Sequence, residues 1–94
     1  MTTRYQANPN VIARSIRGED VLVPLASTME GLDSIYALNE TASLVRRLAA
    51  EGQDAAAIAR QLQEAFDVDA ETAARDVQAV MAELMRIGAL QAAQ

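Results

Sequence analysis

The sequence predicts an α+β domain in which a three-stranded antiparallel sheet is followed by three helices, the outline of a winged helix-turn-helix. Three observations favour this fold class. The segments that suit strands all lie before Asn39, and the segments with helical spacing of apolar residues all lie after it. Asn39 is itself a good helix N-cap, so a strand runs directly into a helix there. Finally, 94 residues suffice for one small domain with a modest core.

The chain begins with a polar segment, residues 1–10, that contains the turn signal Asn8-Pro9-Asn10. We expect a flexible N-terminal arm there, followed by a single domain over residues 11–91. Val11–Ile16 alternates in polarity, with Ile12 and Ile16 on one face and Arg14 between them. This alternation predicts the first strand.

Two further strands and their connections complete the predicted sheet. Gly18–Asp20 is expected to form a tight turn, and Val21–Val23 the second strand. That strand should end near Pro24, which has no N–H to donate to a neighbouring strand. A loop over Ala26–Leu32 then leads to the third strand, Asp33–Leu38. Short connections between successive strands predict an antiparallel meander with the second strand at its centre.

Each predicted helix follows a residue that favours the N-cap position. We expect the first helix to run from Glu40 to Glu51, after Asn39. The second should begin after Asp54 and end at Ala65, and the third should begin after Asp69 and end at Ile87. Glycines after the first and third helices are expected to end them. Leu90 is expected to fold back onto the core. The third helix should face the core with an inner stripe that comprises Ala73, Val77, Val80, Met81 and Leu84.

The residue types argue against catalysis. The chain has no cysteine and no histidine, which excludes disulfides, thiolate nucleophiles, Cys/His zinc sites and histidine-based triads. Two carboxylate pairs, Glu19-Asp20 and Asp67/Asp69, are explained by turn and capping roles. We therefore predict a protein that is not an enzyme and needs no metal or cofactor.

The charge distribution argues against nucleic acid as a partner. The net charge is −5, and residues 48–94 carry all of it. The third helix, which a DNA-binding winged helix would insert into the major groove, carries three acidic residues against two arginines. A DNA-binding protein remains the disfavoured alternative. No apolar run is long enough for a membrane span, and the composition is compatible with the cytoplasm.

The third strand is expected to form an edge of the sheet. The unpaired N–H and C=O groups of an edge strand either dock an extended peptide or are covered by another part of the structure. The alternatives from the residues alone are a peptide-binding site, a homodimer interface, and an edge blocked by the N-terminal arm.

A family resemblance favours the first alternative. Val21-Leu22-Val23, followed by Ile35-Tyr36-Ala37-Leu38-Asn39-Glu40-Thr41-Ala42, resembles the strand-to-helix junction of the PqqD-like family. The resemblance continues through Asp54 to Ile58, Phe66-Asp67-Val68, Asp76-Val77, Leu84 and Gly88-Ala89-Leu90. One departure is Val45-Arg46, where many relatives have Ile-Trp.

The resemblance implies a peptide chaperone, also called a precursor-peptide recognition element, of natural-product biosynthesis. Such proteins bind the leader segment of a ribosomally made precursor peptide and present it to a modifying enzyme, such as a radical SAM enzyme. The leader peptide adds as a strand to the third strand and rests against the third helix. That helix has two flanks beside its inner stripe, and one of them mixes apolar and charged residues. We favour this flank as the binding surface and not the other, which holds Ala74, Gln78 and Met85. The expected peptide-binding residues are Asp33, Ser34, Ile35, Tyr36, Ala37, Leu38, Asp76, Val80, Glu83 and Ile87.

Overall fold

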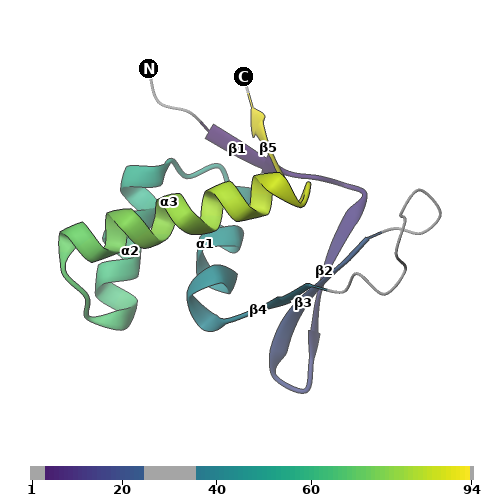
Figure 1. The fold of residues 1–94 in the computed structure, drawn as a ribbon, viewed down its shortest axis with the longest axis horizontal. Coiled ribbons are helices and arrows are strands. Elements are labelled where there is room, and N and C mark those ends of the chain that lie inside the picture. Colours follow the sequence, from purple (N-terminus) through teal and green to yellow (C-terminus); the bar gives the residue numbers. More distant parts are fainter. Residues whose placement is uncertain (1–3, 25–35, 94) are drawn as a thin grey trace.

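The computed structural model describes residues 4–24 and 36–93, which form a mixed α+β fold (Figure 1). The α+β prediction is confirmed, with three helices after the antiparallel meander. The elements are, in chain order, β1 (Arg4–Ala7), β2 (Val11–Ile16), β3 (Glu19–Pro24), β4 (Tyr36–Leu38), α1 (Glu40–Ala50), α2 (Ala55–Phe66), α3 (Ala70–Arg86) and β5 (Leu90–Ala93).

The strands form two separate antiparallel sheets. One has the order β2-β3-β4, so β3 is central, as predicted, and β2 and β4 are its edges. Its register places Arg14 opposite Val21, and Val21 opposite Ala37. Of the predicted third strand the structure describes only Tyr36–Leu38; Asp33, Ser34 and Ile35, and the predicted loop over Ala26–Leu32, lie outside the described residues.

The second sheet pairs the two ends of the described chain, β1 with β5. The segment expected as a flexible arm contains a strand at Arg4–Ala7, whose partner lies at the far end of the sequence. Asn8 holds this region in place, because its side-chain amide donates to the Gly88 carbonyl at 2.7 Å and its backbone N–H donates to the Ala89 carbonyl at 3.0 Å. The division of the chain into residues 1–10 and 11–91 stays a prediction.

The turn between β2 and β3 begins one residue earlier than predicted. Arg17 and Gly18 occupy its two central positions, with φ of 54° and 82°. Glu19 and Asp20 are strand residues, opposite Ile16 and Ser15. A two-residue hairpin turn that matches the twist of its strands needs positive φ at both central positions. Gly18 adopts this at no steric cost, which explains why the turn is centred there and does not extend to Asp20.

The helices begin as predicted. The side chains of Asn39, Asp54 and Asp69 accept hydrogen bonds from the backbone N–H groups of Ala42, Ala57 and Thr72, at 2.8, 2.8 and 2.7 Å. The three helices end within one residue of the predicted positions. Each cap satisfies a backbone donor that would otherwise lack a partner in the first helical turn.

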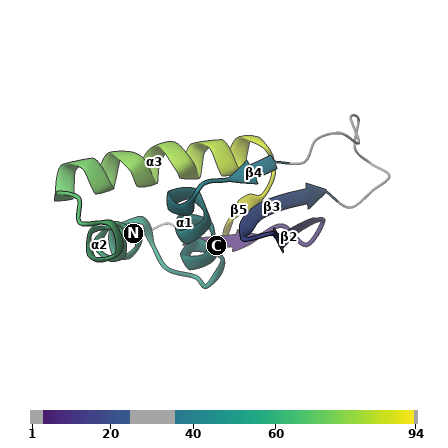
Figure 2. The ribbon, with the colours of Figure 1, turned by 90° about the horizontal axis from the view of Figure 1, so that it is seen from below.

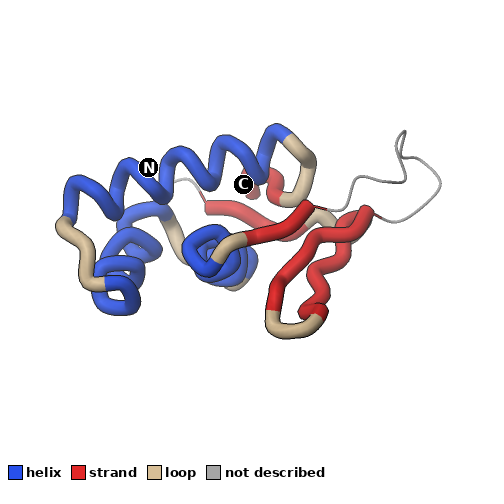
Figure 3. The backbone as a smooth tube through the Cα atoms, turned by 60° about the horizontal axis from the view of Figure 1, so that its bottom comes forward, coloured by secondary structure: helices blue, strands red, loops and turns tan. Residues whose placement is uncertain are grey.

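The core lies between the three helices and the strands β3, β4 and β5. Ala73, Val77, Met81 and Leu84 are buried as predicted, whereas Val80 is only half-buried. The predicted return of Leu90 to the core is confirmed. In Figures 2 and 3, α3 runs along one side of the molecule, from α2 to the strands. The remaining members of the buried cluster are Leu22, Leu38, Val45, Leu48, Ala49, Ile58, Leu62 and Ala89.

Candidate functional site

The candidate site is the edge of β4 that does not pair with β3. Among the described strands, β3 is the only hydrogen-bonded neighbour of β4. The strand lies beside the C-terminal half of α3 (Figure 2). Two features of the sequence fix this position. Leu38 is 7% exposed and anchors the end of the strand in the core, and the cap at Asn39 turns the chain directly into α1.

A groove of about 240 Å³ lies between β4 and α3. It brings together residues from three elements that are far apart in the sequence. They are Tyr36, Ala37 and Leu38 of β4, Asn39 and Ala42 at the start of α1, and Ala79, Val80, Glu83 and Leu84 of α3. A half-buried aromatic ring, small side chains and one carboxylate give the groove mixed apolar and polar walls, as ligand sites commonly have.

Five of the ten predicted site residues line this groove, namely Tyr36, Ala37, Leu38, Val80 and Glu83. Two others, Asp76 and Ile87, are half-buried on α3 or at its end but are not part of the groove lining. Ile87 instead packs against the core cluster, because it caps α3 where the chain turns back toward β5. The three remaining residues, Asp33, Ser34 and Ile35, lie outside the described part of the chain.

Sequence reasoning missed four residues of the groove: Asn39, Ala42, Ala79 and Leu84. The sequence analysis assigned Asn39 and Ala42 to the strand-to-helix junction at the start of α1, and Leu84 to the core. The signal that could have found them is the junction itself, because a strand that runs directly into a helix places the first helical turn beside the strand end. Ala79 is small and exposed, and has no signal of its own in the sequence.

A polar chain connects β4 to α3 at the groove. The Tyr36 hydroxyl donates to Glu83 Oε2 at 2.6 Å, and Arg86 donates to Glu83 from Nε at 2.9 Å and from a terminal nitrogen at 2.5 Å. Hydrogen bonds from Arg86 and then Tyr36 lower the pKa of Glu83 from its ordinary value of 4.5 to about 2. The same hydrogen bond to Glu83 raises the pKa of Tyr36. At neutral pH the groove wall therefore carries a fixed carboxylate and a neutral phenol.

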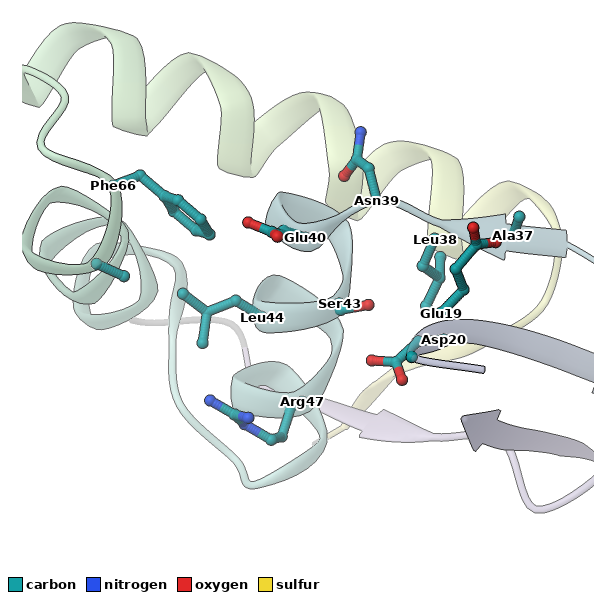
Figure 4. A pocket seen from close by; sticks show the side chains of 12 residues that line it. Glu19, Asp20, Ala37, Leu38, Asn39, Glu40, Ser43, Leu44, Arg47 and Phe66 are labelled. Atoms are coloured by element: carbon teal, nitrogen blue, oxygen red, sulfur yellow. The ribbon is translucent and has the colours of Figure 1, made fainter. Parts of the chain in front are cut away.

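A second, larger hollow of about 860 Å³ also borders β4 (Figure 4). It shares Ala37, Leu38 and Asn39 with the groove, but its other lining residues come from the β2–β3 hairpin and from α1 and α2. Leu44 and Phe66 supply apolar surface, and Glu19, Asp20, Glu40 and Arg47 supply charge. Nothing in the sequence predicted this hollow, since the carboxylates at 19 and 20 were accounted for by a turn.

Residues 21–90, three quarters of the chain, match the family model of Coenzyme PQQ synthesis protein D (PqqD). The chain belongs to the PqqD family. The resemblance that the sequence suggested is thereby confirmed. The matched residues begin at Val21 of β3 and end at Leu90, so they include the whole groove of this PqqD-family chain and leave out β1 and β2.

Two solved structures share the fold. A lasso peptide synthetase B1 complexed with the leader peptide has 23% sequence identity and a TM-score of 0.78, and the match covers 94% of this chain and 98% of that one. TbiB1 in complex with the TbiA(beta) leader peptide has 22% identity and a TM-score of 0.75, covering 92% of this chain and 94% of that one. No curated protein matches the sequence.

The described residues show little that would favour other classes of site. They contain no group of three or more histidine, cysteine, aspartate or glutamate residues placed to hold a metal ion. None of the described helices is both long and apolar enough to cross a membrane. The groove beside β4 combines an unpaired strand edge with mixed apolar and polar walls.

Proposed function

We propose that this chain is a non-catalytic recognition element that binds the leader segment of a ribosomally made precursor peptide and presents it to a modifying enzyme, such as a radical SAM enzyme, in the cytoplasm. The observation that carries the proposal is the groove beside the free edge of β4. Family membership supports it, and so does the shared fold with two proteins solved together with leader peptides.

Binding would follow the chemistry of strand addition. The backbone N–H and C=O groups on the free edge of β4 pair with those of the leader peptide, which gives affinity without regard to sequence. Alternate side chains of an added strand point to the same face. Those that face α3 enter the groove, where Val80 and the Tyr36 ring offer apolar contact and Glu83 offers a carboxylate. Selectivity for particular leader peptides comes from these contacts.

The proposed site also includes the five expected peptide-binding residues that lie outside the groove lining. Asp33, Ser34 and Ile35 precede β4 in the chain and lie outside the described residues, and Asp76 and Ile87 lie on α3 or at its end, beyond the groove lining. The proposal also retains the winged-helix outline, in which the β2–β3 hairpin is the wing. DNA binding by this outline has less support, because Glu71, Asp76 and Glu83 of α3 outnumber its two arginines.

An amide NMR titration with the leader segment of a precursor peptide encoded beside this protein tests the proposal. We expect the largest shifts in Tyr36–Leu38 and in the α3 residues of the groove. No shift there, together with slow amide exchange of Tyr36–Leu38 in the free protein, would mean that the edge is already occupied. A homodimer through β4 would then replace the proposal.

A matched pair of variants on α3 locates the binding flank. Val80→Glu places a charge in the groove, and Met85→Glu places the same charge on the other flank at a side chain that is 42% exposed. We expect Val80→Glu to weaken leader binding at least about tenfold, because an unpaired charge would be buried under the peptide. Met85→Glu should leave binding unchanged. Isothermal titration calorimetry measures both, and equal losses would contradict the assignment of the flank.

A further inference from the structure

The opposite edge of the same sheet, β2, presents exposed apolar side chains. Among the described residues, three large hydrophobic side chains are exposed: Ile12 at 38%, Ile16 at 51% and Met85. Two of them therefore belong to one edge strand. Because side chains alternate along a strand, Ile12, Arg14 and Ile16 share one face, with the arginine between the isoleucines.

The backbone of β2 is accessible as well. The strand pairs with β3 on one side, and no other described strand pairs with it. Five of its six residues are exposed. The β2–β3 hairpin projects away from the helices (Figure 1). An exposed edge with apolar side chains is a template for another strand, and proteins commonly protect such edges with a charge.

Arg14 provides that protection against a second copy of the chain. In an antiparallel β2–β2 pair, the register that packs Ile12 of each copy on Ile16 of the other places Arg14 opposite Arg14. Like charges directly opposite each other destabilise a strand pair. If one β2 strand shifts by one residue along the other, the isoleucines of the two copies point to opposite faces of the pair. If it shifts by two residues, the isoleucines of one copy no longer lie opposite those of the other. Self-pairing therefore loses either charge compatibility or apolar packing.

We propose that the β2 edge is a docking site for an extended segment of a partner protein in which an acidic residue is flanked, two positions away on each side, by branched apolar residues. The acidic side chain pairs with Arg14, and the apolar residues pack on Ile12 and Ile16. Backbone pairing supplies the remaining contacts. Because β2 and β4 are opposite edges of one sheet, a partner at β2 leaves the groove beside β4 free, so the inference does not depend on the proposed function.

The protein itself supplies the probe. The variant Arg14→Glu carries on its own β2 the pattern Ile-x-Glu-x-Ile that the proposal requires of a partner. Mixed with the wild-type protein, it aligns Glu against Arg in the register that also pairs the isoleucines. We expect a heterodimer whose association, measured by sedimentation velocity, is at least about tenfold tighter than that of either protein alone. Amide exchange in the mixture should slow at Val11–Ile16.

Two controls make the result decisive. Circular dichroism should show that Arg14→Glu unfolds at the same temperature as the wild type, because residue 14 is exposed. Adding Ile12→Thr and Ile16→Thr to the Arg14→Glu variant should abolish the heterodimer. The proposal is overturned if the mixture associates no more tightly than its components, if the association survives the loss of both isoleucines, or if the slowed amides lie outside β2.

Discussion

The two edges of the three-stranded sheet have the same backbone chemistry but different surroundings. At β4, Leu38 is buried in the core, Tyr36 is hydrogen-bonded to α3, and a groove runs alongside the strand. At β2, most side chains are exposed and the strand stands away from the helices. The β4 edge is thus shaped by a neighbouring helix, whereas the β2 edge is exposed and carries Arg14 between two isoleucines of the same face.

This difference indicates how each edge could select what it binds. A groove selects by the size and polarity of the side chains that enter it, because its walls are fixed by the core. An exposed edge has no walls, so its selectivity depends on which charges and apolar groups face each other across the new strand pair. We expect substitutions near β4 to affect folding and substitutions on β2 to affect association.

The largest expected effect comes from removing the core anchor of β4. Leu38→Ala deletes a side chain that is 7% exposed, so it should lower the free energy of unfolding by about 2–5 kcal/mol. Ile16→Ala on β2 is the matched control, because its side chain is 51% exposed, and the change should stay within about 0.5 kcal/mol. Urea denaturation measures both. Similar losses at the two positions would show that β2 is as firmly built into the fold as β4.

A smaller effect is expected at the junction between β4 and α1. Asn39→Ala removes the side-chain oxygen that accepts from the Ala42 N–H at 2.8 Å, and should lower stability by about 1 kcal/mol. Asn39→Ser retains an acceptor and should recover most of the loss. Urea denaturation again gives the comparison. If serine were no better than alanine, the position of β4 would not depend on this cap.

The helical half was predictable because its signals are local. A capping side chain and the apolar residues of the next turns lie within a few positions of one another, which is why Asn39, Asp54 and Asp69 mark the starts of α1, α2 and α3. The β2–β3 hairpin was predictable for the same reason. Its turn was misplaced by one residue because the positive φ of Arg17 has no signature in its side chain.

The pairing of β1 with β5 and the groove lining depend on contacts between distant residues. Four-residue strands such as β1 and β5 have too little alternation to be recognised alone, and nothing in the sequence indicates that Arg4 lies opposite Ala93. Part of the groove lining was predictable, because Tyr36 and Leu38 signal a strand and the family resemblance places the third helix beside that strand. The contact of Tyr36 with Glu83 required the three-dimensional structure.

The smallest effect is a pH dependence expected at the β4 edge. The pKa of Glu83 is about 2 in the folded protein, below its ordinary value of 4.5, so the ionised form stabilises the fold. That stabilisation is complete above pH 4.5 and is lost as the pH falls toward 2. Glu83→Gln should therefore unfold at a lower temperature than the wild type at pH 6, and the gap between the two unfolding temperatures should narrow between pH 4.5 and pH 2.

The variant Tyr36→Phe, which removes one of the hydrogen bonds to Glu83, should reproduce part of this behaviour. Thermal melts across this pH range measure the gap, and a constant gap would mean that ionised Glu83, held by Arg86 and Tyr36, does not stabilise the fold in solution. Because Glu83 is partly exposed and screened by water, the change should be smaller than that of Asn39→Ala.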